Sequence, residues 1–207
     1  MVIVVLALVC AGIWSVLLVP DGYGNPDAMQ AAAANPSLGR VAALVATYPG
    51  ALAERTKTAG CTVRGPLPDP ECTPGSVFAN ATPDVICVSG YTKRVRSVST
   101  SLRKQVYAAY GVSYPPPTGS YELDHLIPLA IGGDNSAANL FPEAAVPKPG
   151  FKEKDVVEVY LQEAVCSGEI DLADAQSQVA KDWVAVYNAI DPQDVSRIRQ
   201  KYTSWAN

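Results

Sequence analysis

One block in the middle of the chain, residues 121–143, limits the fold most, because its pattern fits a short hairpin. Residues Tyr121 to Leu126 alternate well enough to form a strand. The run Gly132-Gly133-Asp134-Asn135 then gives a strong turn signal. Leu140 and Phe141 are expected to form a short return strand that Pro142 stops. The predicted sheet therefore has two short strands.

The sequence after this block has the spacing of amphipathic helices. Apolar residues recur on roughly one side from Phe151 to Cys166. Asp191-Pro192 is suited to begin a last helix, since proline fits a first helical turn. Asp171 is placed to cap the helix between these two, whose expected buried face comprises Leu172, Ala175, Val179, Trp183 and Val186. Together with the hairpin, these helices predict an α+β fold with little sheet.

The window between residues 85 and 120 contains no acidic residue, although the whole chain has a net charge of −4. Ser99 or Ser101 can cap a helix in this window that runs to about Tyr110, and Gly111 is positioned to end it. The cations of the window are Lys93, Arg94, Arg96, Arg103 and Lys104. We predict that they form a phosphate-binding face. A solvated face that only keeps the protein soluble is an equal alternative.

Four cysteines follow the N-terminal region: Cys61, Cys72, Cys87 and Cys166. Their spacings fit no Cys-x-x-Cys zinc pattern. In an exported protein they predict up to two disulfides, each worth about 2–4 kcal/mol, with three connectivities open. Buried free thiols are the alternative. The prolines between Cys61 and Cys87 forbid helix there and favour an extended, ordered loop.

The N-terminal residues Val2 to Val19 form an uncharged apolar run. A span of about 20 such residues can cross a bilayer. No Lys or Arg precedes the run, so a cleaved signal and a membrane anchor both remain open. We therefore expect a signal-anchor or transmembrane segment at 1–20, an Ala/Pro/Gly-rich stalk at 21–60 and a folded domain at 61–207. The protein is predicted to be extracytoplasmic, either secreted or held on the membrane through residues 2–19.

The central block also contains the only histidine of the chain, His125, directly after Asp124. With the Gly132-Gly133 turn, Asn139 ahead of the return strand and a helix beyond it, this block resembles the ββα-metal finger of HNH-type (His-Me finger) endonucleases. The resemblance widens to exported bacterial HNH-like proteins through Pro68 to Gly75 and Lys154 to Glu158. It covers about residues 65–187, and it implies a small ββα-metal finger embedded in a mainly helical domain.

The resemblance implies a metal-dependent endonuclease acting on nucleic acid, with DNA favoured over RNA. His125 would be the general base that removes a proton from the attacking water. Asp124 would hold one divalent cation, Mg²⁺ foremost, with Mn²⁺ or Zn²⁺ as alternatives. Asn139 would orient the imidazole or the loop, and the basic residues would bind backbone phosphates without reading sequence.

One position departs from the family pattern, in which the helix after the return strand supplies a second metal ligand. The nominal position falls near Lys148, and a charged lysine cannot bind a cation. Glu158 or Asp155 would supply the missing oxygen, and Lys154 would contact a phosphate. Two other interpretations stay open. One is a catalytically inactive HNH-like module that binds nucleic acid or an envelope polymer. The other is a disulfide-stabilised extracellular interaction domain in which Asp124 and His125 are structural.

Overall fold

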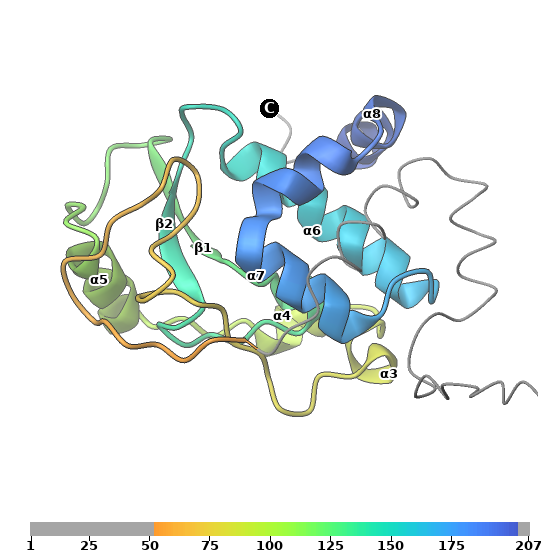
Figure 1. Cartoon of the computed structure of the whole chain (residues 1–207), viewed down its shortest axis with the longest axis horizontal. Coiled ribbons are helices and arrows are strands. Elements are labelled where there is room, and N and C mark those ends of the chain that lie inside the picture. The colour runs from red at the N-terminus through yellow and green to blue at the C-terminus, as the bar shows by residue number, and fades with distance from the viewer. Residues whose placement is uncertain (1–51, 203–207) are drawn as a thin grey trace, which may run out of the picture.

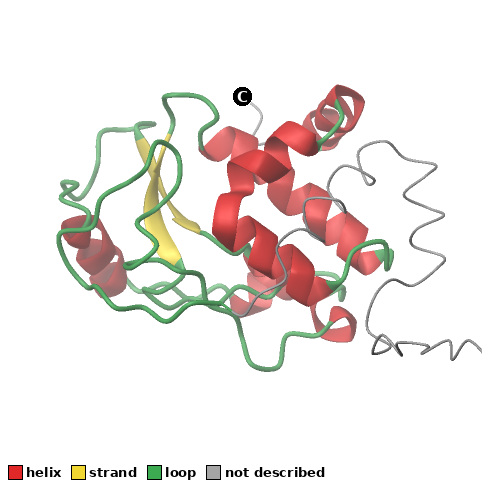
Figure 2. Cartoon of the chain, viewed as in Figure 1, coloured by secondary structure: helices red, strands yellow, loops and turns green. Residues whose placement is uncertain are grey.

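The computed structural model describes residues 52–202, and they form a mainly helical α+β fold around one hairpin. Two antiparallel strands lie between α5 on one side and the C-terminal helices on the other (Figure 1). In chain order the elements are α3 (Pro83–Ile86), α4 (Tyr91–Val95), α5 (Thr100–Ala109), β1 (Tyr121–His125), η1 (Leu129–Ile131), β2 (Leu140–Ala144), α6 (Phe151–Cys166), α7 (Leu172–Ala189) and α8 (Pro192–Lys201). Figure 2 shows that the described residues before the hairpin are mostly long loops. The predicted α+β class is confirmed at this level. The prediction that no helix forms between Cys61 and Cys87 is wrong at the end of that segment, where α3 begins at Pro83, since proline fits a first helical turn.

The hairpin forms where the alternation predicted it, but the return strand is longer than expected. Pro142 lies inside β2, opposite Leu123, rather than ending the strand. A two-stranded sheet has only edge strands, and a proline is tolerated there when its nitrogen faces away from the partner strand. The strand therefore continues to Ala144 and brings Glu143 opposite Glu122.

The two glycines of the predicted turn are required for different reasons. Gly132 adopts a positive φ of 85°, a conformation that side chains disfavour. At Gly133 an added Cβ would lie 1.8 Å from the carbonyl oxygen of Ile127 and 2.8 Å from Nδ2 of Asn139. Only glycine allows the loop between the strands to fold back this closely.

The helices begin at the residues that the caps predicted. The hydroxyl of Ser99 accepts a hydrogen bond from the backbone N–H of Leu102, and the carboxylate of Asp171 accepts from Ala173 and Asp174. Pro192 occupies the first turn of α8. The predicted buried face of α7 is confirmed in full: Leu172, Ala175, Val179, Trp183 and Val186 are all buried. These residues belong to the main core, which α7 forms with α6 and the loop after β1.

All four predicted cysteines form disulfides, and the structure selects one of the three connectivities. Cys61 pairs with Cys72, and Cys87 pairs with Cys166. The second bond joins the end of α3 to the end of α6, across 79 residues of sequence. Two disulfides indicate an extracellular or otherwise oxidising environment.

The apolar run at residues 2–19 and the stalk up to residue 51 lie outside the described residues. Within residues 52–202, none of the helices is both long enough and apolar enough to cross a membrane. The prediction of an anchor or signal thus concerns a part of the chain on which the structure does not bear.

Asp69 organises the loop closed by the first disulfide. Its buried carboxylate accepts hydrogen bonds from the Lys57 ammonium at 2.9 Å and from the backbone N–H groups of Thr62 and Glu71 at 3.0 Å each. Burial alone would raise the pKa of this carboxyl, but the lysine and the two N–H groups together lower it to about 2. The ionised form is therefore the one that stabilises the loop.

We expect the Asp69→Asn variant to be about 2 kcal/mol less stable than the native protein near pH 6. A carboxyl with a pKa of about 2 when folded and 3.8 when unfolded stabilises the fold fully above pH 5. That contribution is lost as the pH falls from 4 to 2, so the two proteins should converge in stability there. Urea unfolding at a series of pH values measures this, and a pH-independent difference would contradict it.

Candidate functional site

Asp124 and His125 stand next to each other at the end of β1, but their side chains turn to opposite sides of the hairpin. Successive side chains of a strand alternate in this way. The carboxylate of Asp124 meets Lys154 on α6, whereas the imidazole of His125 meets Asn135 in the loop beside α4. The site therefore has two halves, an imidazole half and a carboxylate half.

Asn135 fixes the imidazole half. Its Nδ2 donates to the carbonyl of Val95 at 2.8 Å, and its Oδ1 accepts from the backbone N–H of Ser97 at 3.2 Å. These two bonds settle the orientation of the amide, so Oδ1 faces Nε2 of His125, which lies 3.2 Å away. Nε2 must then carry the hydrogen, and Nδ1 carries the lone pair in the neutral ring.

The His125 side chain is neutral at ordinary pH. Its residue is only 2% exposed, and this burial lowers the pKa of the imidazole to about 4. Asp124 and the bond to Asn135 oppose the shift, while Arg96 adds to it. A neutral imidazole with a lone pair on Nδ1 has the form that a general base needs.

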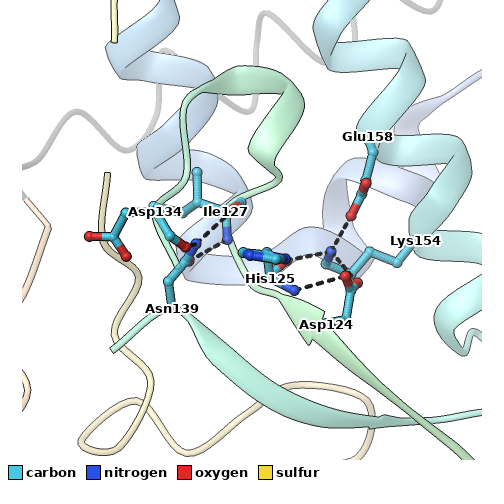
Figure 3. A network of polar contacts seen from close by, with 7 residues as sticks. All are labelled: Asp124, His125, Ile127, Asp134, Asn139, Lys154 and Glu158. Carbon is cyan, nitrogen blue, oxygen red and sulfur yellow. Dashed lines mark hydrogen bonds and ion pairs between the residues drawn. The ribbon is translucent and has the colours of Figure 1, made fainter. Parts of the chain in front are cut away.

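Asn139 holds the loop rather than the imidazole. Its Oδ1 accepts from the backbone N–H of Ile127 at 2.8 Å, and its Nδ2 donates to the carbonyls of Ile127 at 2.9 Å and Asp134 at 3.0 Å (Figure 3). Of the two predicted roles, orienting the loop is the one observed. The residue that contacts the ring, Asn135, was missed, although it belongs to the Gly-Gly-Asp-Asn turn that the sequence marks clearly.

Lys154 occupies the carboxylate half. Its residue is fully buried, and its Nζ donates to Asp124 Oδ2 at 2.7 Å, to the carbonyl of His125 at 2.6 Å and to Glu158 Oε1 at 2.7 Å (Figure 3). Burial alone would lower the pKa of this ammonium, but the surrounding carboxyl groups raise it above its usual range. Lys154 is therefore a buried cation, and the predicted contact with a substrate phosphate is closed to it.

The residue of α6 that reaches Asp124 is thus Lys154, not the position near Lys148 that the spacing suggested. Lys148 lies in the loop before α6, where its exposed ammonium donates to Glu153 at 2.8 Å. Its side chain is 54% exposed, in contrast to the enclosed side chain of Lys154. The helix begins three residues beyond Lys148, and its residues Lys154 and Glu158 are the ones that lie beside Asp124.

Glu143 is a further member of this half that the sequence did not reveal. It lies on the same face of the hairpin as Asp124 and is 1% exposed. Neither of its carboxyl oxygens accepts a hydrogen bond from a described donor; its neighbour is the carboxyl of Asp124. Burial raises the pKa of Glu143 well above its usual value, and Asp124 raises it further. A protonated Glu143 can donate a hydrogen bond to the Asp124 carboxylate.

The two carboxyls of α6 that were predicted as metal ligands differ in placement. Glu158 binds Lys154 and so lies beside Asp124, and burial raises the pKa of its carboxyl. Asp155, in contrast, forms no hydrogen bond or ion pair with Lys154 or Asp124 in the described part of the chain. Burial and the nearby carboxylates of Glu158 and Asp124 raise the pKa of Asp155 to about 8. Only Glu158 is brought together with Asp124.

A divalent cation does not fit this arrangement. Oδ1 of Asp124 accepts from the backbone N–H of His125 at 2.8 Å, and Oδ2 is taken by the ammonium of Lys154. The facing oxygen of Glu158 is taken by the same ammonium. Within residues 52–202 no group of three or more His, Cys, Asp or Glu side chains is arranged to hold a metal ion. The ammonium, rather than a metal, joins the predicted ligands.

The residues of the predicted basic face differ in whether their charges act on the site. Arg96 is exposed and lies close enough to lower the pKa of His125, and its charge also acts on Glu122 and Glu158. Arg103, on α5, acts on Glu122 as well. Lys93, Arg94 and Lys104 are exposed too, but Arg94 donates to the carbonyl of Ser89, and Lys104 lies 6.0 Å from the ring centroid of Tyr114. Arg96 is the cation of this window whose charge lowers the pKa of His125.

Comparisons of this chain with protein-family models, with curated proteins and with solved structures find no match.

Proposed function

We propose that this chain hydrolyses phosphodiester bonds of nucleic acid, with His125 as the general base. The observation that carries the proposal is the contact of 3.2 Å between Nε2 of His125 and Oδ1 of Asn135, which orients the ring and leaves the lone pair to Nδ1; burial, which lowers the pKa of the imidazole to about 4, favours the neutral form. The hairpin followed by a helix, which resembles the HNH finger, adds support. So does the exposed guanidinium of Arg96, which can neutralise a phosphate.

The reaction needs only groups of the imidazole half and water. Nδ1 of His125 takes a proton from a water molecule as its oxygen attacks the phosphorus. The bond from phosphorus to the leaving sugar oxygen breaks, and that oxygen takes a proton from solvent. The imidazolium then returns its proton to solvent. Because the described residues do not fit the metal that the HNH resemblance implies, no step is assigned to one.

A binding module without catalysis is the second candidate, and one observation favours it. Lys154 joins Asp124 to Glu158, so the residues expected to hold a catalytic cation are engaged with each other. In this case Arg96 and its neighbours would hold nucleic acid, while the buried network would serve stability alone.

A nicking assay on supercoiled plasmid tests the proposal. We expect the protein to nick DNA, and His125→Ala to lower the rate at least 100-fold, since a positioned general base contributes about 10²–10⁴. Lys148→Ala, which changes an exposed lysine outside both halves of the site, should keep the native rate. Each reaction is run with Mg²⁺ and with excess EDTA.

Two results would contradict hydrolysis by His125. Nicking that survives His125→Ala unchanged would assign the activity elsewhere or to a contaminant. Absence of nicking in both buffers, together with DNA binding that weakens steeply with salt, would favour the binding module.

A further inference from the structure

Lys154 has the surroundings of a bound cation. Three oxygens surround its Nζ at 2.6–2.7 Å: a carboxylate oxygen of Asp124, the carbonyl oxygen of His125 and a carboxylate oxygen of Glu158. They come from two elements that are distant in sequence, the end of β1 and the N-terminal half of α6. Figure 3 shows the ammonium at the point where these groups converge.

Glu143 adds a further carboxyl group to this cluster. It is 1% exposed, and neither of its oxygens accepts a hydrogen bond from a described donor. The charges of Lys154 and Asp124 both act on it. Burial favours its neutral, protonated form, whereas a cation bound beside Asp124 would favour the ionised form. Glu143 could then supply one more oxygen to such a cation.

We propose that Lys154 is a built-in substitute for a metal ion: its ammonium fills an oxygen cage that would otherwise bind a divalent cation. The native protein then takes no divalent cation between Asp124 and Glu158. This inference concerns cation binding alone and does not rest on the proposed hydrolysis.

The size of the cage indicates which cation would replace the ammonium. Ca²⁺ binds oxygens at 2.3–2.6 Å, whereas Mg²⁺ requires 2.0–2.1 Å and a near-octahedral shell. The oxygens around Nζ lie at 2.6–2.7 Å, so they would need to move only slightly for Ca²⁺. For Mg²⁺ each would have to move by about 0.6 Å. The emptied cage should therefore prefer Ca²⁺.

Truncation of the lysine tests the proposal. In Lys154→Ser the ammonium and most of its chain are gone, and we expect one Ca²⁺ per chain to bind with a Kd of about 0.1–1 mM. At 10 mM Ca²⁺ the Tm of this variant should rise by about 5 °C. The native protein should show neither calorimetric binding nor a change in Tm with Ca²⁺ or Mg²⁺.

Two further variants locate the ion. Lys154→Met keeps the cage filled with an uncharged chain of similar length, so it should bind no Ca²⁺. Adding Glu158→Gln to Lys154→Ser should weaken Ca²⁺ binding at least tenfold, because a carboxylate ligand is lost. Equal binding in the serine and methionine variants would place the ion elsewhere and overturn the proposal.

Cation binding by the native protein would contradict the proposal most directly. If it binds Ca²⁺ or Mg²⁺, and Asp124→Asn abolishes that binding, then a metal displaces the ammonium and the proposal is wrong. A serine variant that folds but binds no Ca²⁺ at 10 mM also overturns it, as does one that stays unfolded at that concentration. Failure to cleave DNA affects neither readout, so it would count against the hydrolysis and not against the cage.

Discussion

Replacing Lys154 with methionine is expected to lower the free energy of unfolding by about 3–5 kcal/mol. The ammonium is fully buried and bound to Asp124 and Glu158, so its removal leaves carboxyl groups in an enclosed site with no cation. Breaking a buried ion pair on one side costs more than the pair contributes, because the remaining charge is uncompensated. Urea unfolding followed by the fluorescence of buried Trp183 measures the loss.

A triple variant separates the effect of losing the positive charge from the effect of disturbed packing. When Asp124→Asn and Glu158→Gln are added to Lys154→Met, no uncompensated charge remains, and most of the stability should return. The matched control is Lys148→Met, whose exposed pair with Glu153 should be worth at most about 1 kcal/mol. A loss below 1 kcal/mol in Lys154→Met would show that the buried network is not an ion-pair network.

Removing the long-range disulfide should have an effect of similar size. Cys87 and Cys166 close a loop of 79 residues, for which the loss of chain entropy in the unfolded state corresponds to about 4.5 kcal/mol. A domain of this size has a total stability of about 5–15 kcal/mol, so the double serine variant should be barely folded at 37 °C. Thermal unfolding of the purified variant measures this.

The other disulfide serves as the comparison. Cys61 and Cys72 close a loop of only 11 residues, for which the same relation gives about 2.8 kcal/mol. Comparing the stability losses of the two double variants is therefore a sharper test than either loss alone. It fails if loss of the short loop destabilises the protein as much as loss of the long one.

The elements of this fold were readable because their signals are local. Ser99, Asp171 and Pro192 mark helix starts by chemistry within one turn, and the apolar spacing from Leu172 to Val186 needs only the helical period. The Gly132-Gly133 pair likewise places the loop of the hairpin. The cysteine pairing was not readable, because it depends on which elements pack together.

The carboxylate half of the site was predicted only in part, because Glu158 does lie beside Asp124 but the buried Lys154 between them was not foreseen. A lysine within a charged stretch of helix is expected to face solvent, since this residue is almost never fully buried unless it is paired. Its partner Asp124 lies 30 residues earlier in the sequence, and Glu143 is buried only because β2 continues past Pro142. Spacing alone pointed to Lys148, which ends up outside the site.

The hydrogen bonds between the Asn139 side chain and the backbone of Ile127 join the two ends of the loop between these residues. One side chain contacts both the N–H and the carbonyl of a residue 12 positions away, much as a neighbouring strand would. An added or deleted residue in this loop would break these bonds or move Asn135 away from the imidazole of His125. Substitutions at its other, partly exposed positions should be tolerated if Gly132, Gly133, Asn135 and the buried Ile131 are kept, whereas changes of length should not be. The length of this loop therefore sets where Asn135 meets the imidazole of His125.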